Sequence, residues 1–87
     1  MVDEVIEEFE KYGAYEELIS LFESNLVGER NHVIAELGIL YAKYQHEKLM
    51  EHCRNYYSNM NVHKVIRNYE QNYCWEEVVF LYSHYNG

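Results

Sequence analysis

The feature that most constrains this chain is a sequence repeat at a spacing of 60 residues. Residues 15–22 read YEELISLF and return at 75–82 as WEEVVFLY (75 − 15 = 60). The match extends upstream, where the apolar residues of 2–10 align with those of 62–70. The exchanges conserve size, such as Phe for Tyr and Leu for Val, as expected of side chains that share a packing role. Self-similarity of this kind indicates a repeat protein, in which each unit buries its apolar face against its neighbours.

Composition indicates a single small helical domain that spans residues 1–87. The chain has no Pro and 4 Gly in 87 residues, which disfavours a fold built on tight turns. No apolar run approaches the ~20 residues of a membrane span, and the acidic N-terminus differs from a signal peptide. We therefore expect a cytosolic protein. The two cysteines fit a reducing compartment, where Cys53 reads as a small buried residue and Cys74 lies in a predicted turn; a disulfide between them stays open.

The net charge of −8 is concentrated near the N-terminus. Residues 1–29 contain nine acidic residues and one basic residue, whereas acids and bases balance in residues 30–87. Nucleic acid is a disfavoured partner, because phosphate binding needs a basic surface. The acidic third could meet a basic partner. The preferred interpretation is that its first acids occupy the start of a helix and face water.

Apolar residues recur at helical spacing in six segments, within residues 2–12, 15–26, 33–44, 49–57, 62–73 and 75–85. Gly13 and Gly28 end the first two, Asn31 is the expected N-cap of the third, and Asn59 and Asn61 mark a later break. We expect helices of about 11–14 residues joined by short links, which pair neighbours as antiparallel hairpins. The prediction is an all-α protein, an α-solenoid of about three stacked hairpins.

A set of apolar residues is predicted to hold this stack together. Trp75 is expected to be a core anchor whose replacement by Ala costs about 3–5 kcal/mol. Ten tyrosines suit a layer only two helices thick, and a tyrosine stripe that binds peptide is the less favoured alternative. Both outer hairpins carry full apolar faces, which predicts a segment of a longer array. The expected packing residues are Tyr15, Leu18, Ile19, Phe22, Leu37, Tyr41, Leu49, Val65, Ile66, Trp75, Val78, Val79 and Tyr82.

Several strings of the sequence match a known repeat family in order. They are GAYEELISLFE at 13–23, GER at 28–30 with His32, ELGILYAKY at 36–44, EKLMEH at 47–52, NV at 61–62, KVIR at 64–67 and EVVFLY at 77–82. Tetratricopeptide repeats fit less well, because they need a 34-residue period and a closing Pro. The chain instead resembles the clathrin heavy chain, in a repeat of its proximal leg. It departs from that pattern at His46 and His63, where the family usually has Pro, and between His32 and Glu36, where it is slightly shorter.

The resemblance implies a structural segment in the leg of a three-legged coat protein that forms cages on vesicles. The implied partners are clathrin light chains and neighbouring heavy-chain legs, with membranes contacted only indirectly through adaptors. The implied location is the cytoplasm, on coated pits and coated vesicles. One alternative is a subunit of an endosomal or vacuolar tethering complex, which uses the same type of repeat. Another is a free-standing helical adaptor or metal-responsive regulator.

The sequence does not indicate a catalytic or metal-binding site. His52 and Cys53 are adjacent and point about 100° apart on a helix, and His46, His63, Cys74 and His84 fall at other spacings, so no metal site is expected. Ser20, Ser24, Ser58 and Ser83 lack a Gly-rich elbow. The adjacent glutamate pairs 7–8, 16–17 and 76–77 diverge on a helix and make poor acid and base couples. We expect no enzyme and no cofactor.

Overall fold

A computed structural model describes residues 2–24 and 31–85. These residues form six α-helices and two short 3-10 helices, with no strand among them. The all-α prediction is confirmed. The helices are α1 (Val2–Lys11), α2 (Tyr15–Ser24), α3 (Asn31–Tyr44), α4 (Leu49–Tyr56), α5 (Val62–Gln71) and α6 (Trp75–Tyr85), with η2 (His46–Lys48) and η3 (Tyr57–Asn59) flanking α4.

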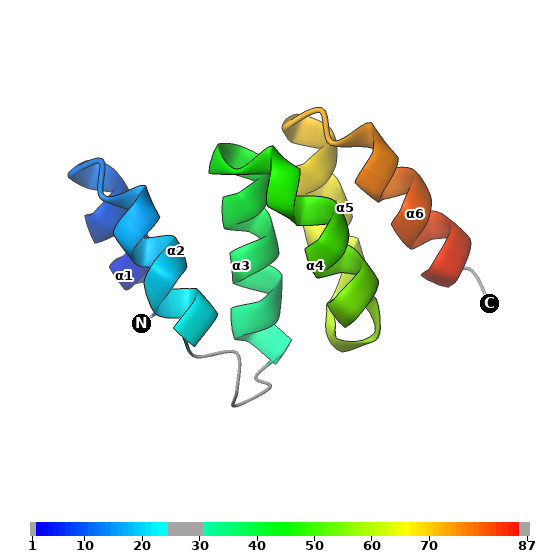
Figure 1. Ribbon diagram of the computed structural model, residues 1–87, viewed down its shortest axis with the longest axis horizontal. Helices are drawn as coiled ribbons and strands as arrows, with labels where there is room; N and C mark the ends of the chain where they lie inside the picture. The colour runs from blue at the N-terminus through cyan, green and yellow to red at the C-terminus, as the bar shows by residue number, and fades with distance from the viewer. Residues whose placement is uncertain (1, 25–30, 86–87) are drawn as a thin grey trace.

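The helices stack in chain order along one axis, as the predicted solenoid requires. Figure 1 shows α1 and α2 at one end, α3, α4 and α5 in the middle, and α6 at the other end. The principal extents of the chain are 39 × 28 × 20 Å. The helices pack as neighbours, α2 on α3, α3 on α4 and α5, and α4 and α5 on α6. Each hairpin therefore lies against the next one.

The two copies of the sequence repeat close with the same turn. The amide of Gly13 donates to Glu10 O at 3.1 Å, and the amide of Tyr73 donates to Glu70 O at the same distance. Gly13 and Tyr73 both have positive φ. The expectation that Tyr12 and Tyr73 continue the apolar stripes is wrong, because both side chains lie exposed at these turns.

Helix ends differ from prediction in detail. The Asn61 side chain caps α5 by accepting the Lys64 amide at 3.3 Å, so the predicted break is confirmed. Asn31 is itself the first residue of α3, which corrects its assignment as N-cap. Four helices are shorter than expected, and α4 has 8 residues because 3-10 turns take up both of its flanks. The expected end of the second helix near Gly28 lies outside the described residues.

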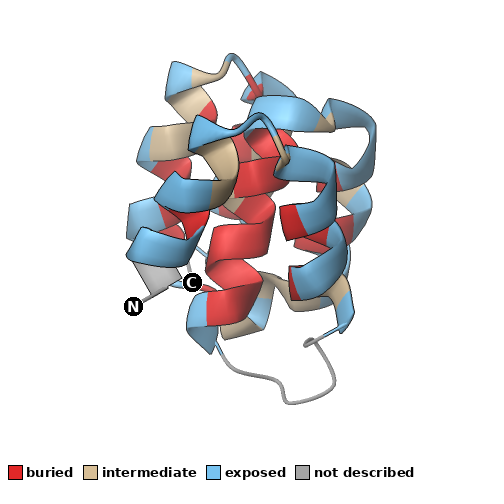
Figure 2. Cartoon of the chain, turned by 90° about the vertical axis from the view of Figure 1, so that its left-hand side faces the viewer, coloured by how far each residue is buried: buried red, intermediate tan, exposed pale blue. Residues whose placement is uncertain are grey.

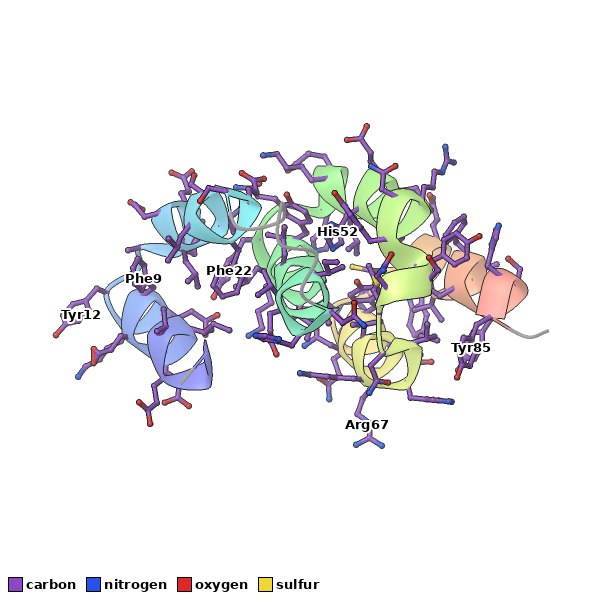
Figure 3. The ribbon with its side chains drawn as sticks, turned by 90° about the horizontal axis from the view of Figure 1, so that it is seen from below. Phe9, Tyr12, Phe22, His52, Arg67 and Tyr85 are labelled. Carbon is purple, nitrogen blue, oxygen red and sulfur yellow. The ribbon has the colours of Figure 1, made fainter. Side chains whose placement is uncertain are left out.

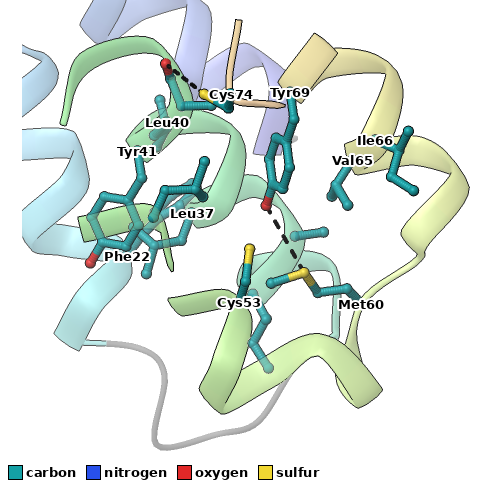
Figure 4. Close-up of a cluster of buried hydrophobic side chains, with 14 of the residues drawn as sticks. Phe22, Leu37, Leu40, Tyr41, Cys53, Met60, Val65, Ile66, Tyr69 and Cys74 are labelled. Atoms are coloured by element: carbon teal, nitrogen blue, oxygen red, sulfur yellow. Dashed lines mark hydrogen bonds between the residues drawn. The ribbon is translucent and has the colours of Figure 1, made fainter. Parts of the chain in front are cut away.

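The core is centred on α3, which contributes nine buried residues. Figure 2 shows the buried residues running through the middle of the molecule. In Figure 4, Phe22, Leu37 and Tyr41 lie on one side of the core and Val65 and Tyr69 on the other, with Cys53 between. The prediction that Cys53 is buried is confirmed.

Candidate functional site

The predicted packing residues divide into two groups. Nine are buried, namely Leu18, Ile19, Phe22, Leu37, Tyr41, Leu49, Val65, Ile66 and Val78. The other four are exposed, namely Tyr15 at the edge of the stack, at 37%, and Trp75, Val79 and Tyr82 on α6. Trp75 is 55% exposed, so its assignment as a core anchor of this chain is wrong. The reason is local, since no described helix covers that side of α6; a packing role against a further repeat stays a prediction.

The three of these residues on α6 share one side of that helix, because positions i, i+4 and i+7 coincide on a helix. We call Trp75, Val79 and Tyr82 the α6 face. Ile19 and Phe22, their counterparts on α2, are 1% and 7% exposed, whereas Val79 and Tyr82 are 66% and 53% exposed. The difference arises because α3 packs on α2. The same sequence stripe is thus covered in the first copy and open in the last.

The opposite side of the hairpins shows the reverse pattern. Val5 on α1 is 39% exposed, whereas its counterpart Val65 on α5 is fully buried, because α3 packs against α5. Ile6 and Ile66 are buried alike, at 8% and 7%, as expected of residues inside each hairpin. Each copy therefore has an inner core and two outer sides, and it buries an outer side only where a neighbour is present.

The covered α2 stripe shows what a neighbouring helix brings to such a surface. Tyr44 of α3 stacks on Tyr15, with ring centroids 4.4 Å apart and an interplanar angle of 12°. The Tyr44 hydroxyl donates to Glu10 Oε2 at 2.5 Å, and Lys43 Nζ lies 3.3 Å from the same oxygen. Burial and this hydrogen bond raise the pKa of Tyr44 to about 12. Glu10 thus receives two donors from the next hairpin.

A second carboxylate, that of Glu23 on α2, makes a similar contact, whereas Glu10 lies on α1. The Tyr41 hydroxyl donates to Glu23 Oε2 at 2.5 Å, and Lys48 Nζ lies 3.5 Å from that oxygen. Burial and the Glu23 carboxylate hold the pKa of Tyr41 well above its usual range. Sequence reasoning missed both carboxylates. The recurrence of Glu10 as Glu70 is the signal that could have pointed to the first.

His52 is a buried structural residue at the junction of α3 and α4. Its Nε2 lies 2.8 Å from the carbonyl oxygen of Ile34, so this nitrogen carries the proton and donates. The ring also meets Tyr41 edge-on, with centroids 5.3 Å apart. Burial lowers the pKa of His52, the hydrogen bond to Ile34 acting in the opposite direction. Figure 3 places His52 between neighbouring helices and Tyr12 pointing away from them.

Two of the cavities on the surface of the stack are lined by described residues. A groove of about 190 Å³ runs between α5 and α6 and is lined in part by Ile66, Glu70, Tyr82 and Tyr85. A wider one of about 350 Å³ lies at the junction of α2, α3 and α4 and includes Glu23, Tyr41, Lys48 and His52. Both are lined by aromatic rings and charged side chains. Neither holds an arrangement of nucleophile and base.

The side chains that could bind a metal or act as nucleophiles have structural roles in the described part of the chain. Among residues 2–24 and 31–85, no group of three or more His, Cys, Asp or Glu is placed to hold a metal ion. Cys53 and Cys74 are free, buried thiols, and burial raises the pKa of Cys53 to about 12. The hydroxyls of Ser24 and Ser83 donate to backbone carbonyls of their own helices. None of the described helices has the length and apolar character needed to cross a bilayer.

Known proteins identify the repeat. A family model described as a region in clathrin and VPS matches residues 1–87. The clathrin heavy chain of Dictyostelium discoideum is 48% identical over 87 residues, clathrin heavy chain 1 of Arabidopsis thaliana 42% over 87, and clathrin heavy chain 2 of Homo sapiens 41% over 86. These matches cover 98%, 98% and 97% of this chain and 5% of each relative's length. The chain belongs to the clathrin repeat family.

Proposed function

We propose that this chain is a structural segment of a clathrin heavy-chain leg and part of a longer solenoid. In this role it is a scaffold and performs no catalysis. The leg would support assembly of the vesicle coat in endocytosis and intracellular transport, in the cytoplasm and on coated pits and vesicles. The observation that carries the proposal is the stack of hairpins with repeated turns, in a chain that matches clathrin heavy chains over almost all of its length.

The mechanism follows from the way the hairpins contact each other. Within each junction, buried aliphatic residues supply most of the stabilisation, and paired hydroxyls and carboxylates fix the register. Because each hairpin contacts only the hairpins next to it, the chain forms a rod, and small rotations at each junction set the curvature of that rod. Such a rod can transmit the geometry of a coat while bending slightly. Weak lateral contacts along its surface would keep assembly reversible.

The proposed partners are clathrin light chains and neighbouring heavy-chain legs, with the membrane reached through adaptors. The exposed sides of the helices supply the surface for such contacts, including the wider cavity around Lys48 and Glu51. The family description also names VPS proteins. A repeat of a tethering-complex subunit is therefore the second candidate, although the three relatives named above are clathrin heavy chains.

The test is the size and sedimentation of the parent polypeptide. An antibody raised against residues 31–85 would detect it in a cell extract, with antibody pre-absorbed on the same segment as the control. We expect a very large chain that sediments with coated vesicles and co-precipitates a light chain. A large chain found with tethering complexes would favour the second candidate. An 87-residue species in the soluble fraction would refute both.

A further inference from the structure

The wider cavity, of about 350 Å³, gathers groups from four successive elements of the stack. α2, α3 and η2 contribute Glu23, Tyr41 and Lys48, and α4 contributes among others Glu51, His52 and Tyr56. The cavity thus combines two carboxylates with three rings. A ligand that suits such a lining carries positive charge and donates hydrogen bonds.

A lysine of the chain shows how this cavity holds a cation. Lys48 Nζ lies 3.5 Å from Glu23 Oε2 and 5.9 Å from the centre of the Tyr41 ring. A carboxylate beside an aromatic face is the combination that attracts ammonium and guanidinium groups. The Lys48 side chain is itself half exposed. It therefore pairs with Glu23 and leaves the groups that α4 supplies without a cation.

Those α4 groups repeat the combination of a carboxylate and a ring. Among the described contacts, the Glu51 carboxylate has no hydrogen-bond or ion-pair partner, and the residue is exposed. The Tyr56 ring is half-buried and lies against His52, with ring centroids 5.1 Å apart. Positions 52 and 56 are one helical turn apart, so both rings lie on one side of α4.

His52 adds a buried acceptor to the cavity. It is 4% exposed and lines the cavity. Its Nε2 donates to Ile34 O, and a Cβ on Gly38 would lie 3.3 Å from its Cδ2, so the Cδ2–Nε2 edge of the ring faces α3. Nδ1 is the ring atom opposite that edge, and in this tautomer it is an acceptor. No described group donates to Nδ1, so an acceptor is left on the side of the ring that faces away from α3.

From this arrangement we propose that the cavity binds the guanidinium group of an arginine side chain on a partner protein. A guanidinium has five N–H donors in one plane, so it can donate to Glu51 and to His52 while its face lies against a tyrosine ring. An ammonium has fewer donors and is more strongly hydrated, which makes lysine the poorer ligand. The net charge of −8 also attracts a basic segment of a partner. The identity of that partner rests on the proposed function, whereas the chemistry of the cavity does not.

The experiment is a titration of the isotope-labelled 87-residue chain followed by NMR, with N-acetyl-arginine amide as the probe. We expect saturable shifts of the amides of residues 51–56 and of the His52 ring nitrogens, with a dissociation constant in the millimolar range for so small a ligand. N-acetyl-lysine amide should bind at least about threefold more weakly, because its ammonium satisfies fewer acceptors. N-acetyl-citrulline amide, which has the shape of arginine without its charge, should not bind measurably. Methylguanidine lacks the aliphatic chain of arginine and should bind more weakly than the arginine probe.

Variants test which groups hold the probe. Glu51→Gln should weaken binding about fivefold, because a charge-assisted hydrogen bond is lost. Glu47→Gln is the matched control and should leave binding unchanged, since Glu47 is an exposed acid on η2 that does not line the cavity. Lys48→Met should strengthen binding about threefold, because it removes the cation that occupies Glu23 and the Tyr41 face while keeping a long side chain.

Four results would overturn the proposal. Shifts that do not saturate would exclude a site, and equal binding of the arginine and lysine probes would exclude recognition of a guanidinium. Equal losses in Glu51→Gln and Glu47→Gln would show a general attraction to an acidic surface. Equal binding of methylguanidine and the arginine probe would assign the cavity to a free guanidine instead of a protein side chain. Each result is independent of co-sedimentation with coats, so failure of this proposal and failure of the proposed function are distinguishable.

Discussion

Gly13 and Tyr73, 60 residues apart, occupy the same left-handed backbone position, with φ of 71° and 62°. Glycine adopts this conformation without strain, whereas an L side chain there costs about 1 kcal/mol or more. A Cβ on Gly13 would meet no atom within 4 Å, so the cost at that site comes from the backbone alone. The two turns therefore form a matched pair for measuring the free-energy cost of an L side chain at positive φ.

Tyr73→Gly is expected to stabilise the chain by about 0.5–1 kcal/mol, because the exposed tyrosine ring gives up little packing and the strain is relieved. Gly13→Ala should destabilise by a similar amount. Urea unfolding followed by circular dichroism would measure both. Equal effects of the same sign at the two positions would contradict the shared turn.

Gly38→Ala should destabilise the chain by about 1–3 kcal/mol, although Ala is the better helix former, because overpacking a core is costly. The new Cβ would overlap the Tyr69 hydroxyl and lie 3.3 Å from Cδ2 of His52. Tyr69→Phe removes the overlapping oxygen, whose bond to Met60 Sδ is long at 4.0 Å. In thermal unfolding, Gly38→Ala should therefore cost less in the Tyr69→Phe background. Additive effects would show that another contact decides the cost.

Acid should weaken the fold through His52. Its pKa is lowered in the folded protein, whereas the unfolded chain has the ordinary value of about 6.5. Above that pH both states are neutral; as pH falls through it, the unfolded state takes up a proton that the folded state excludes. The free energy of unfolding should then fall by up to about 1.4 kcal/mol per pH unit, until pH reaches the folded pKa.

The control for this pH dependence is an exposed histidine. Urea unfolding at several pH values would compare the native chain with His52→Gln and His63→Gln. The glutamine at 52 keeps a donor near Ile34 O without titrating, so its profile should be flatter than that of the native chain. If His63→Gln flattens the profile as much, the titration of His52 is not the cause.

Phe22→Ala and Tyr82→Ala test the difference between the two copies. Phe22 is buried, so its removal should cost about 3–5 kcal/mol, enough to unfold much of so small a chain at 25 °C. Tyr82 is exposed, and its removal should cost about 0.5 kcal/mol or less. Trp75→Ala should also lower the free energy of unfolding only slightly, whereas the loss of a core anchor would lower it by several kcal/mol. Comparable losses for Phe22 and Tyr82 would place Tyr82 in the core.

Periodicity predicted the six helices and their pairing because the apolar stripes match a helical period. It could not show which stripes are covered, since Ile19 and Val79 are equivalent in sequence and only α3 distinguishes them. The contacts of Glu10 on α1 and of Glu23 on α2 depend on how the first hairpin packs against α3, which tertiary structure sets. Tyr73 at a positive φ escaped prediction because glycine is the usual residue there.

The reversed burial of the two copies gives the stack a polarity. Val79 is open where Ile19 is closed, and Val5 is open where Val65 is closed, so the two ends present different surfaces. Contact between unlike ends is heterologous: it leaves one surface unsatisfied at each terminus and builds an open row, whereas a closed pair needs a self-complementary surface. Such a row has a single polarity, because every unit points the same way, and a constant rotation from one unit to the next.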